Sequence, residues 1–281
     1  MSVLFPVVVG VAATLVAAAA VQVPAGDAAN AKLGDDLARV ARLRVLFGHQ
    51  SVGGNVLAGV ARLSAAHGGV LGVTEVRGAG PLAPGLSHAL VGENGAPRTK
   101  LDAFAALLAR LEGPPPDVAL VKLCWADFGA DTDADALFEV YRTALAELAR
   151  RHPRTTFVHV TVPLTTVQGG ARALVKGALG KPPYGLLENA RREAFNARLR
   201  AEYGGRAPLF DLARLEATAP DGSVTRAEWR GTSTLALAPA YTDDGGHLVA
   251  AAQDRIARAL LATLAALPVA APERAPFPPQ R

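Results

Sequence analysis

From residue 35 to residue 267, short apolar runs alternate with longer segments in which apolar residues recur every three or four positions. Short apolar runs are typical of buried strands, and the longer spacing is typical of amphipathic helices. The alternation predicts a three-layer α/β/α domain with a five-stranded, mostly parallel sheet. The predicted strands cover residues 44–47, 70–77, 117–123, 156–162 and 208–212. The predicted helices cover residues 35–42, 52–63, 99–111, 133–150, 185–203 and 248–267.

Three stretches of the chain fit neither pattern. Residues 82–98 and 163–183 are rich in glycine and proline and are interpreted as long loops, and residues 216–240 as an irregular excursion. Long loops in a compact domain often carry functional side chains. In the second loop, Arg172 and Lys176 are interpreted as solvated residues rather than as an anion site.

Both ends of the chain differ from the middle. Residues 3–23 are almost entirely apolar and end in small residues, a pattern typical of a secretory signal, and the run is nearly long enough for a membrane anchor. We therefore expect residues 1–25 to be a signal peptide or N-terminal anchor, and the protein to be exported to the periplasm or secreted. Residues 30–267 form the predicted domain. Residues 268–281, with five prolines, are expected to be a disordered tail.

Composition removes several classes of function. Half of the residues are apolar, which is enough for a sizeable core. The net charge of +4 is spread along the chain without a basic run, so nucleic-acid binding has no support. Cys124 is the single cysteine, which excludes an intrachain disulfide and a cysteine-based zinc site.

Polar side chains that can carry chemistry stand at the ends of several predicted elements. Ser51 follows the first strand, Asp127 follows the third, and Asp244 and His247 precede the last helix. The carboxyl ends of parallel strands meet at one edge of a sheet, so we expect these side chains to converge there. A serine, a histidine and a carboxylate arranged in this way perform nucleophilic acyl transfer. The two glycines between Asp244 and His247 allow a turn tight enough to bring the carboxylate to the imidazole.

Each of these residues also has a simpler interpretation. Ser51 could be a plain helix N-cap, and residues 244–247 could cap the last helix. A third interpretation is a metal site, if His49, Asp127 and His247 met at the same edge.

The chain resembles the SGNH/GDSL-type hydrolases, specifically divergent bacterial members that carry F-G-H-Q-S-V-G, here residues 47–53, instead of the usual G-D-S block. The family's last block, D-x-x-H, is matched by D-G-G-H at residues 244–247. The resemblance extends over residues 44–267 and implies a flavodoxin-like α/β fold. It places the nucleophile role on Ser51, the acid role on the aspartate of the last block and the base role on its histidine.

The middle blocks depart from the family's pattern. The oxyanion glycine corresponds to Gly78 or Gly80. The G-x-N-D block corresponds to residues 124–127, where alanine stands in place of the asparagine that donates to the oxyanion. The groups that could supply this donation are the N–H of Val52 and the side chains of Asn55 and Asn94. The residues expected to support the site are His49, Gln50 and Asp127.

The resemblance implies a serine esterase that needs no cofactor or metal and acts on a small-molecule or glycan ester with a short-chain or carbohydrate-linked acyl group. The same chemistry could transfer an acyl group to a sugar hydroxyl. The altered third block leaves a second class of function open, a non-catalytic domain that binds a glycan or a protein.

Overall fold

A computed structural model describes residues 26–268 of the chain, so the predicted N-terminal signal or anchor and nearly all of the predicted C-terminal tail lie outside the described residues. The central sheet has six strands in the order β2-β4-β1-β6-β7-β8, and every pair of neighbours is parallel. The α/β class and the parallel sheet are confirmed, and the expected number of five strands was wrong. The strands are β1 (Arg44–His49), β2 (Val73–Glu75), β4 (Gly85–Leu90), β6 (Val118–Val121), β7 (Thr156–Val160) and β8 (Leu209–Phe210).

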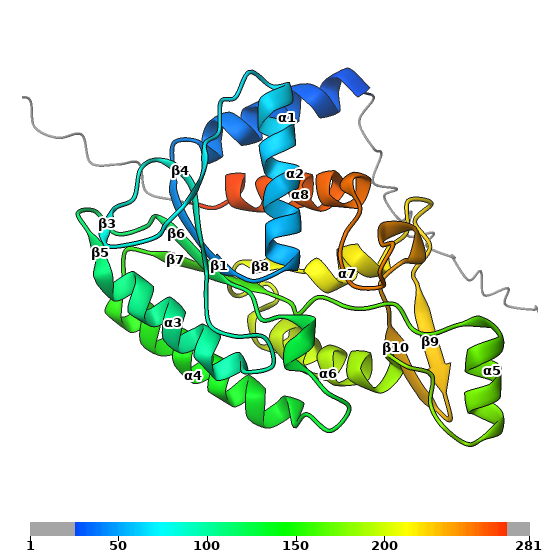
Figure 1. The fold of residues 1–281 in the computed structure, drawn as a ribbon. Helices are drawn as coiled ribbons and strands as arrows, with labels where there is room; N and C mark the ends of the chain where they lie inside the picture. The colour runs from blue at the N-terminus through cyan, green and yellow to red at the C-terminus, as the bar shows by residue number, and fades with distance from the viewer. Residues whose placement is uncertain (1–25, 269–281) are drawn as a thin grey trace, which may run out of the picture.

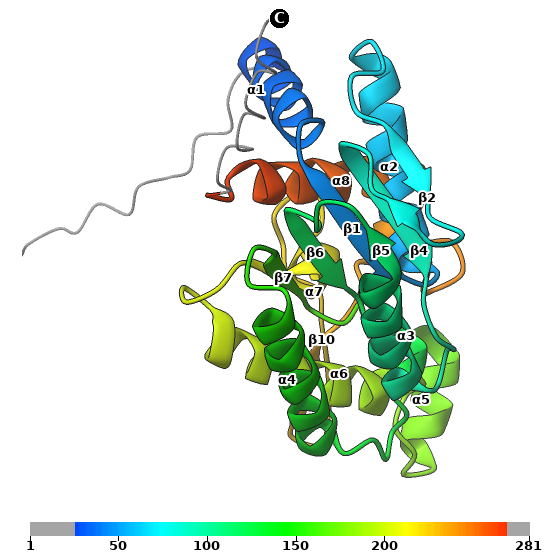
Figure 2. The same ribbon diagram turned by 90° about the vertical axis from the view of Figure 1, so that its left-hand side faces the viewer.

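Helices cover both faces of the sheet (Figure 1). Viewed at 90°, the strands lie between the two helical layers (Figure 2). Successive side chains of a strand point to opposite faces, and β1 shows this directly, because Val45 and Phe47 pack in one buried cluster and Leu46 in the other. One layer consists of α1 (Gly26–Val40), α2 (Val52–Ala66), α7 (Leu212–Ala217) and α8 (Ala250–Ala265). The other consists of α3 (Pro97–Arg110), α4 (Ala134–Arg151) and α6 (Leu186–Tyr203).

The sixth strand, β4, lies within the stretch that was expected to be a loop. It occupies the place beside β1, while the predicted second strand is reduced to β2 at the sheet edge. Prolines and a glycine near the start of β4 made its sequence resemble a loop. In the structure, the neighbouring strands β1 and β2 both pair with β4 and stabilise its extended conformation. Two short segments, β3 (Gly80–Pro81) and β5 (Leu111–Glu112), pair with each other beyond the amino-terminal edge of the sheet.

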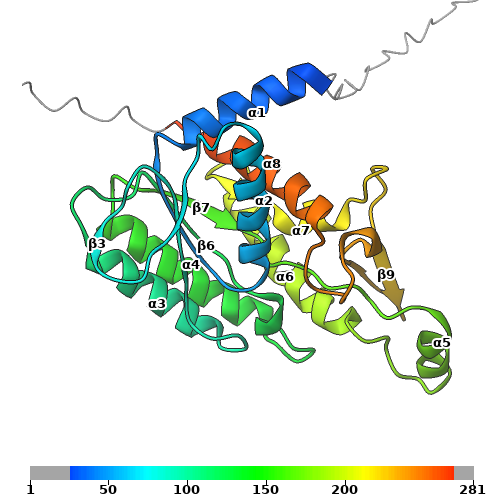
Figure 3. The same ribbon diagram turned by 45° about the horizontal axis from the view of Figure 1, so that its top comes forward.

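Two further elements replace segments that were expected to be irregular. Helix α5 (Gly170–Ala178) projects from the body of the molecule, next to the hairpin formed by β9 (Arg226–Trp229) and β10 (Thr232–Leu235) (Figure 3). A Cβ built at Gly177 would lie 3.3 Å from the Trp229 ring, so helix and hairpin touch at this point. No helix among residues 26–268 is both long and apolar enough to cross a lipid bilayer.

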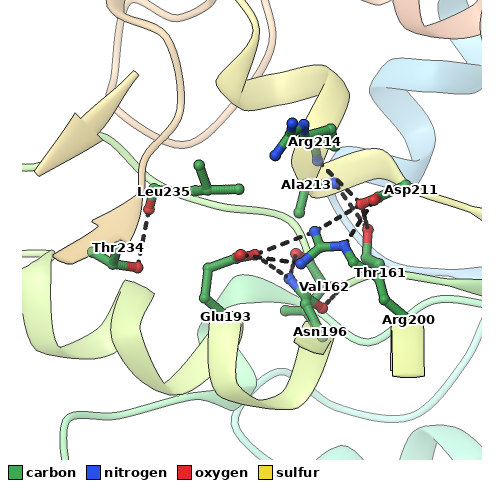
Figure 4. A network of polar contacts seen from close by, with 10 residues as sticks. All are labelled: Thr161, Val162, Glu193, Asn196, Arg200, Asp211, Ala213, Arg214, Thr234 and Leu235. Atoms are coloured by element: carbon green, nitrogen blue, oxygen red, sulfur yellow. Dashed lines mark hydrogen bonds and ion pairs between the residues drawn. The ribbon is translucent and has the colours of Figure 1, made fainter. Parts of the chain in front are cut away.

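A network of polar side chains fastens α6 to the ends of β7 and β8 (Figure 4). The Arg200 guanidinium makes two hydrogen bonds to the Asp211 carboxylate, at 2.7 and 2.8 Å. Asn196 bonds both backbone groups of Val162, donating to its oxygen at 3.0 Å and accepting from its N–H at 2.7 Å. These contacts fix the segment after β7, which carries Thr165 and Thr166 toward the site described next.

Candidate active site

Ser51 stands at the sharp turn between β1 and α2. Its φ of 43° and ψ of −103° lie outside the regions that L-residues other than glycine ordinarily adopt. A Cβ at Gly53 would lie 2.4 Å from the Cβ of His49, so only glycine permits this turn. Ser51 occupies the N-cap position of α2, but its hydroxyl caps no backbone N–H. The N-cap interpretation therefore does not explain the side chain.

The hydroxyl of Ser51 instead meets the imidazole of His247. Ser51 Oγ lies 2.5 Å from His247 Nε2, and His247 Nδ1 lies 2.6 Å from Asp244 Oδ2. With the imidazole proton on Nδ1, the hydroxyl donates to Nε2 and Nδ1–H donates to the carboxylate. The structure thus brings together three of the four side chains that were expected to converge, although Ser51 and Asp244 are 193 positions apart along the chain.

The turn of residues 244–247 prepares the carboxylate for this contact. Asp244 Oδ1 accepts from the N–H groups of His247 and Gly246 at 2.8 and 2.9 Å. These backbone N–H groups, together with the His247 ring, hold the pKa of the Asp244 carboxyl well below its usual range. Asp244 is therefore ionised at neutral pH and can stabilise an imidazolium on His247. The turn needs Gly245, whose φ is 87°.

Three neighbours hold His247 in place. The Trp125 ring meets the imidazole edge-on, with ring centroids 6.0 Å apart. The N–H of Leu248 donates to Asn55 Oδ1 at 3.1 Å, and the N–H of Thr166 donates to Gly245 O at 2.9 Å. Asn55, which was a candidate oxyanion donor, thus ties the first turn of α2 to the segment that carries His247.

Asp127 supports the site from within the protein. Its Oδ1 lies 2.5 Å from Lys100 Nζ, and both side chains are completely buried. The same carboxylate accepts from the N–H of Cys124 at 2.6 Å and from the N–H of Gly95 at 2.9 Å. Asp127 therefore fastens the loop after β4 to η1 (Trp125–Asp127). Lys100 lies on the buried face of α3, one turn before Phe104, and a lysine on an apolar face is a sequence signal that we missed.

Asn94 is exposed at the tip of the loop that Asp127 holds. The loop closes with a hydrogen bond from the N–H of Ala96 to Glu93 O at 3.3 Å. A Cβ at Gly95 would lie 3.9 Å from the oxygen of Ala126, so the loop tip lies beside this alanine.

His49 and Gln50 support the turn that carries Ser51. His49 Nε2 lies 3.1 Å from His88 Nδ1, and burial, with smaller effects of His88 and Lys122, lowers the pKa of His49 to about 3. A neutral His49 thus pairs with His88 and takes no part in the contact between Ser51 and His247. Gln50 Nε2 donates to the oxygen of Gly92 at 2.9 Å, which joins the Ser51 turn to the end of β4.

Gly92, which the Gln50 side chain joins to the turn that carries Ser51, was not singled out from the sequence. The last pair of the β1–β4 ladder is His49 with Leu90, and the N–H of Val91 continues it by donating to His49 O at 3.1 Å. A Cβ at Gly92 would lie 2.4 Å from the backbone nitrogen of Lys100, and its φ is 57°, so no other residue fits there. The sequence contained no signal for Gly92, because β4, the strand that precedes it, was expected to be part of a loop.

The structure does not bring Gly78 or Gly80 to Ser51. Gly80 pairs with Leu111 in the β3–β5 ladder, at the end of the molecule away from the N-terminus of α2 (Figure 1), and Gly78 lies two residues before it. Both glycines follow the second predicted strand, which the structure reduces to the edge strand β2, whereas β4 is the strand beside β1.

The metal-site interpretation finds no support in the geometry of residues 26–268, where no three His, Cys, Asp or Glu side chains gather closely enough to hold an ion. Of the three proposed ligands, His49 pairs with His88, Asp127 pairs with Lys100, and only His247 faces Ser51.

A pocket of about 520 Å³ opens beside the imidazole of His247. Its lining includes Trp125, Gly246, Tyr184 and Lys176 of α5. The indole N–H of Trp125 is buried and has no hydrogen-bond partner among the described residues. Of the residues that line the pocket, only Asp244 and His247 were expected from the sequence to carry the chemistry, and Lys176 was interpreted as a solvated loop residue.

Comparison with known proteins finds likeness in structure only. No protein-family model matches the sequence, and neither does any curated protein. An acetyl esterase structure with acetate ion is 14% identical over 79% of this chain and 96% of that chain, with a TM-score of 0.44. A carbohydrate esterase family 3 protein from Talaromyces cellulolyticus has the same identity, coverage and TM-score. A salicylyl-acyltransferase from a tetracycline biosynthetic pathway is 13% identical over 81% of this chain and 56% of that chain, with a TM-score of 0.42. At these identities the likeness concerns the fold alone.

Proposed function

We propose that this protein is a serine esterase of the SGNH type that hydrolyses short-chain or carbohydrate-linked acyl esters. One observation carries the proposal: the hydroxyl of Ser51, held at a strained backbone position, lies 2.5 Å from His247, which lies 2.6 Å from Asp244. Strained backbone is more frequent at functional sites than elsewhere. A serine paired in this way with a histidine and an ionised carboxylate has the arrangement of an activated nucleophile.

The proposed reaction follows from these contacts. Ser51 Oγ attacks the ester carbonyl while His247 Nε2 takes the hydroxyl proton, and Asp244 stabilises the resulting imidazolium. His247 then gives the proton to the departing alkoxide, which leaves an acyl-enzyme on Ser51. Water, activated by His247, releases the acid and restores the serine. A sugar hydroxyl in place of water would make the same site an acyltransferase.

Two backbone N–H groups are proposed to bind the oxyanion. The N–H of Val52, the first residue of α2, has no acceptor within its helix, as is general for the first turn. The N–H of Gly92 finds no acceptor among residues 26–268, and Gln50 anchors Gly92 beside the Ser51 turn. The side chain of Asn94, on the loop held by Asp127, is the proposed third donor in place of the asparagine that Ala126 replaces.

We expect Asn94→Ala to lower kcat about tenfold with little change in KM. The loss should be smaller than the roughly 10²–10³-fold cost of deleting a rigid oxyanion donor, because the Asn94 side chain is exposed and makes no fixed contact. Steady-state kinetics with an aryl acetate measures the effect, and Glu93→Gln, at the exposed neighbouring position, is the control. Equal kcat in Asn94→Ala and the wild type would remove Asn94 from the oxyanion site.

Covalent labelling tests the proposed function against the alternative of a non-catalytic binding domain, which the alanine at position 126 favours. A fluorophosphonate probe should modify Ser51 of the wild-type protein, as mass spectrometry of the labelled peptide would show, and an aryl acetate should be hydrolysed. Ser51→Ala should lose both signals, while Ser223→Ala, at an exposed serine whose hydroxyl bonds only Asp221 among residues 26–268, should retain them. A folded wild-type protein that neither reacts with the probe nor turns over the ester would contradict the esterase proposal.

A further inference from the structure

The pocket beside His247 lies where the alcohol part of an ester would leave. Its lining includes His247 and the Asp244 turn, but neither Ser51 nor Asn94. In acyl transfer the histidine donates its proton to the departing alkoxide, so the alcohol must lie against the imidazole while the carbonyl oxygen faces the oxyanion donors. A pocket of about 520 Å³ is within the size range of sites for small molecules.

Lys176 contributes a positive charge to the lining of this pocket. Lys176 Nζ lies 5.8 Å from the centroid of the Tyr184 ring, and no carboxylate among the described residues is within ion-pair distance. Lys176 is half-buried and lines the pocket, whereas Arg172, one turn earlier on α5, is exposed and does not line it. The two basic residues, which the sequence did not distinguish, are therefore in different environments.

A second positive charge, that of Arg192, contacts residues that line the pocket. Arg192 is only 3% exposed, and its guanidinium donates to Trp125 O at 3.1 Å, to Thr165 Oγ1 at 2.8 Å and to Asn189 Oδ1 at 2.6 Å. All three acceptors are neutral, and Glu188 and Glu216 act on Arg192 only from beyond ion-pair distance. A buried charge without a counter-ion is unusual and adds positive potential beneath Trp125 and Thr165, which line the pocket.

The one carboxylate that lines the pocket is already engaged. The oxygens of Asp244 accept from the His247 ring, from two backbone N–H groups and from the Thr242 hydroxyl. We infer that the pocket selects esters whose alcohol part carries an anionic group, such as a carboxylate, sulfate or phosphate, which pairs with Lys176. The inference rests on the proposed esterase function, and it specifies the class of alcohol that the site releases.

A matched pair of esters tests this specificity. The acetyl ester of 4-hydroxybenzoate has an anionic leaving alcohol, and the acetyl ester of methyl 4-hydroxybenzoate is its neutral counterpart. Lys176→Met should lower kcat/KM for the anionic ester about tenfold more than for the neutral one, as expected for loss of a charge-assisted contact. Lys181→Met is the control, because it removes the same charge from an exposed position after α5 and should affect both esters equally. Comparing each variant with the wild type cancels the intrinsic difference in reactivity between the esters.

Two outcomes would overturn the inference: equal losses on both esters in Lys176→Met, or the same discrimination in Lys181→Met.

Binding of 4-hydroxybenzoate to Ser51→Ala, followed by NMR, tests the pocket without turnover. Adding Lys176→Met should weaken this binding about tenfold. If Lys176→Met leaves the binding unchanged, or if neither Ser51→Ala nor the double variant binds 4-hydroxybenzoate, the anion pocket is rejected even if the esters are hydrolysed. If the wild type is inactive but binds the anion through Lys176, only the esterase proposal is rejected.

Discussion

Ser51→Ala and His247→Ala should each lower kcat for an aryl acetate by about 10⁴-fold or more, and the double variant should be no worse than the poorer single one. Serine and histidine act as a unit in the proposed mechanism, so removing one makes the other useless. The short contact between Ser51 Oγ and His247 Nε2 supports this coupling. Asp244→Asn should cost somewhat less, because the imidazole remains but loses the charge that stabilises its protonated form.

Steady-state and single-turnover kinetics measure these losses, with circular dichroism to show that each variant is folded. Independent roles would make the loss in the double variant approach the product of the two single losses. That result would mean that Ser51 and His247 do not form a catalytic pair, even if each contributes to activity.

Lys100→Met should destabilise the protein by roughly 3–5 kcal/mol, because it leaves the carboxylate of Asp127 buried without its partner. Lys100 and Asp127 both have side chains that are 0% exposed, and Lys100 Nζ also donates to Glu93 O at 2.7 Å. Combining Lys100→Met with Asp127→Asn should recover part of the loss, since the second change removes the stranded charge.

Urea unfolding of Lys100→Met, of Asp127→Asn and of the double variant measures the coupling between the two residues as a double-mutant cycle. Lys32→Met is the control, because Lys32 makes a surface ion pair with Asp36 one helical turn away and should change stability by less than about 1 kcal/mol. A loss in Lys100→Met no larger than that of the control would show that the buried pair contributes nothing to the fold.

The alternation of apolar runs and helical spacing was sufficient to predict the fold class, but not the order of the strands. Strand β4 was missed because its sequence, Gly85–Leu90, follows two prolines and is too short to show a period. The conformation of β4 depends on its pairing with the two neighbouring strands, and this pairing is a tertiary contact that the local sequence pattern does not predict. Because β4 was missed, the sequence offered Gly78 and Gly80, and not the proposed Gly92, as oxyanion glycines.

The contact of Ser51 with residues 244–247 could be anticipated because both segments have tight, glycine-containing turns at the ends of regular elements. The pocket could not, because Trp125, Thr165 and Lys176 come from three separate connections whose relative positions depend on packing. Lys176 in particular belongs to α5, a short helix that begins and ends among glycines and buries no residue, and its apolar side chains Leu174 and Val175 are exposed instead of facing a core.

At position 51 the residue that would best stabilise the fold differs from the residue that the proposed reaction needs. A φ of 43° suits glycine, so the fold taken alone would be served better by a residue without a side chain, and the serine costs on the order of 1 kcal/mol. Screening variants of this protein for thermal tolerance alone would thus favour Ser51→Gly and discard the hydroxyl. Selection for heat resistance should therefore be coupled to an assay of ester turnover, because glycine suits the backbone at position 51 and serine suits the proposed reaction.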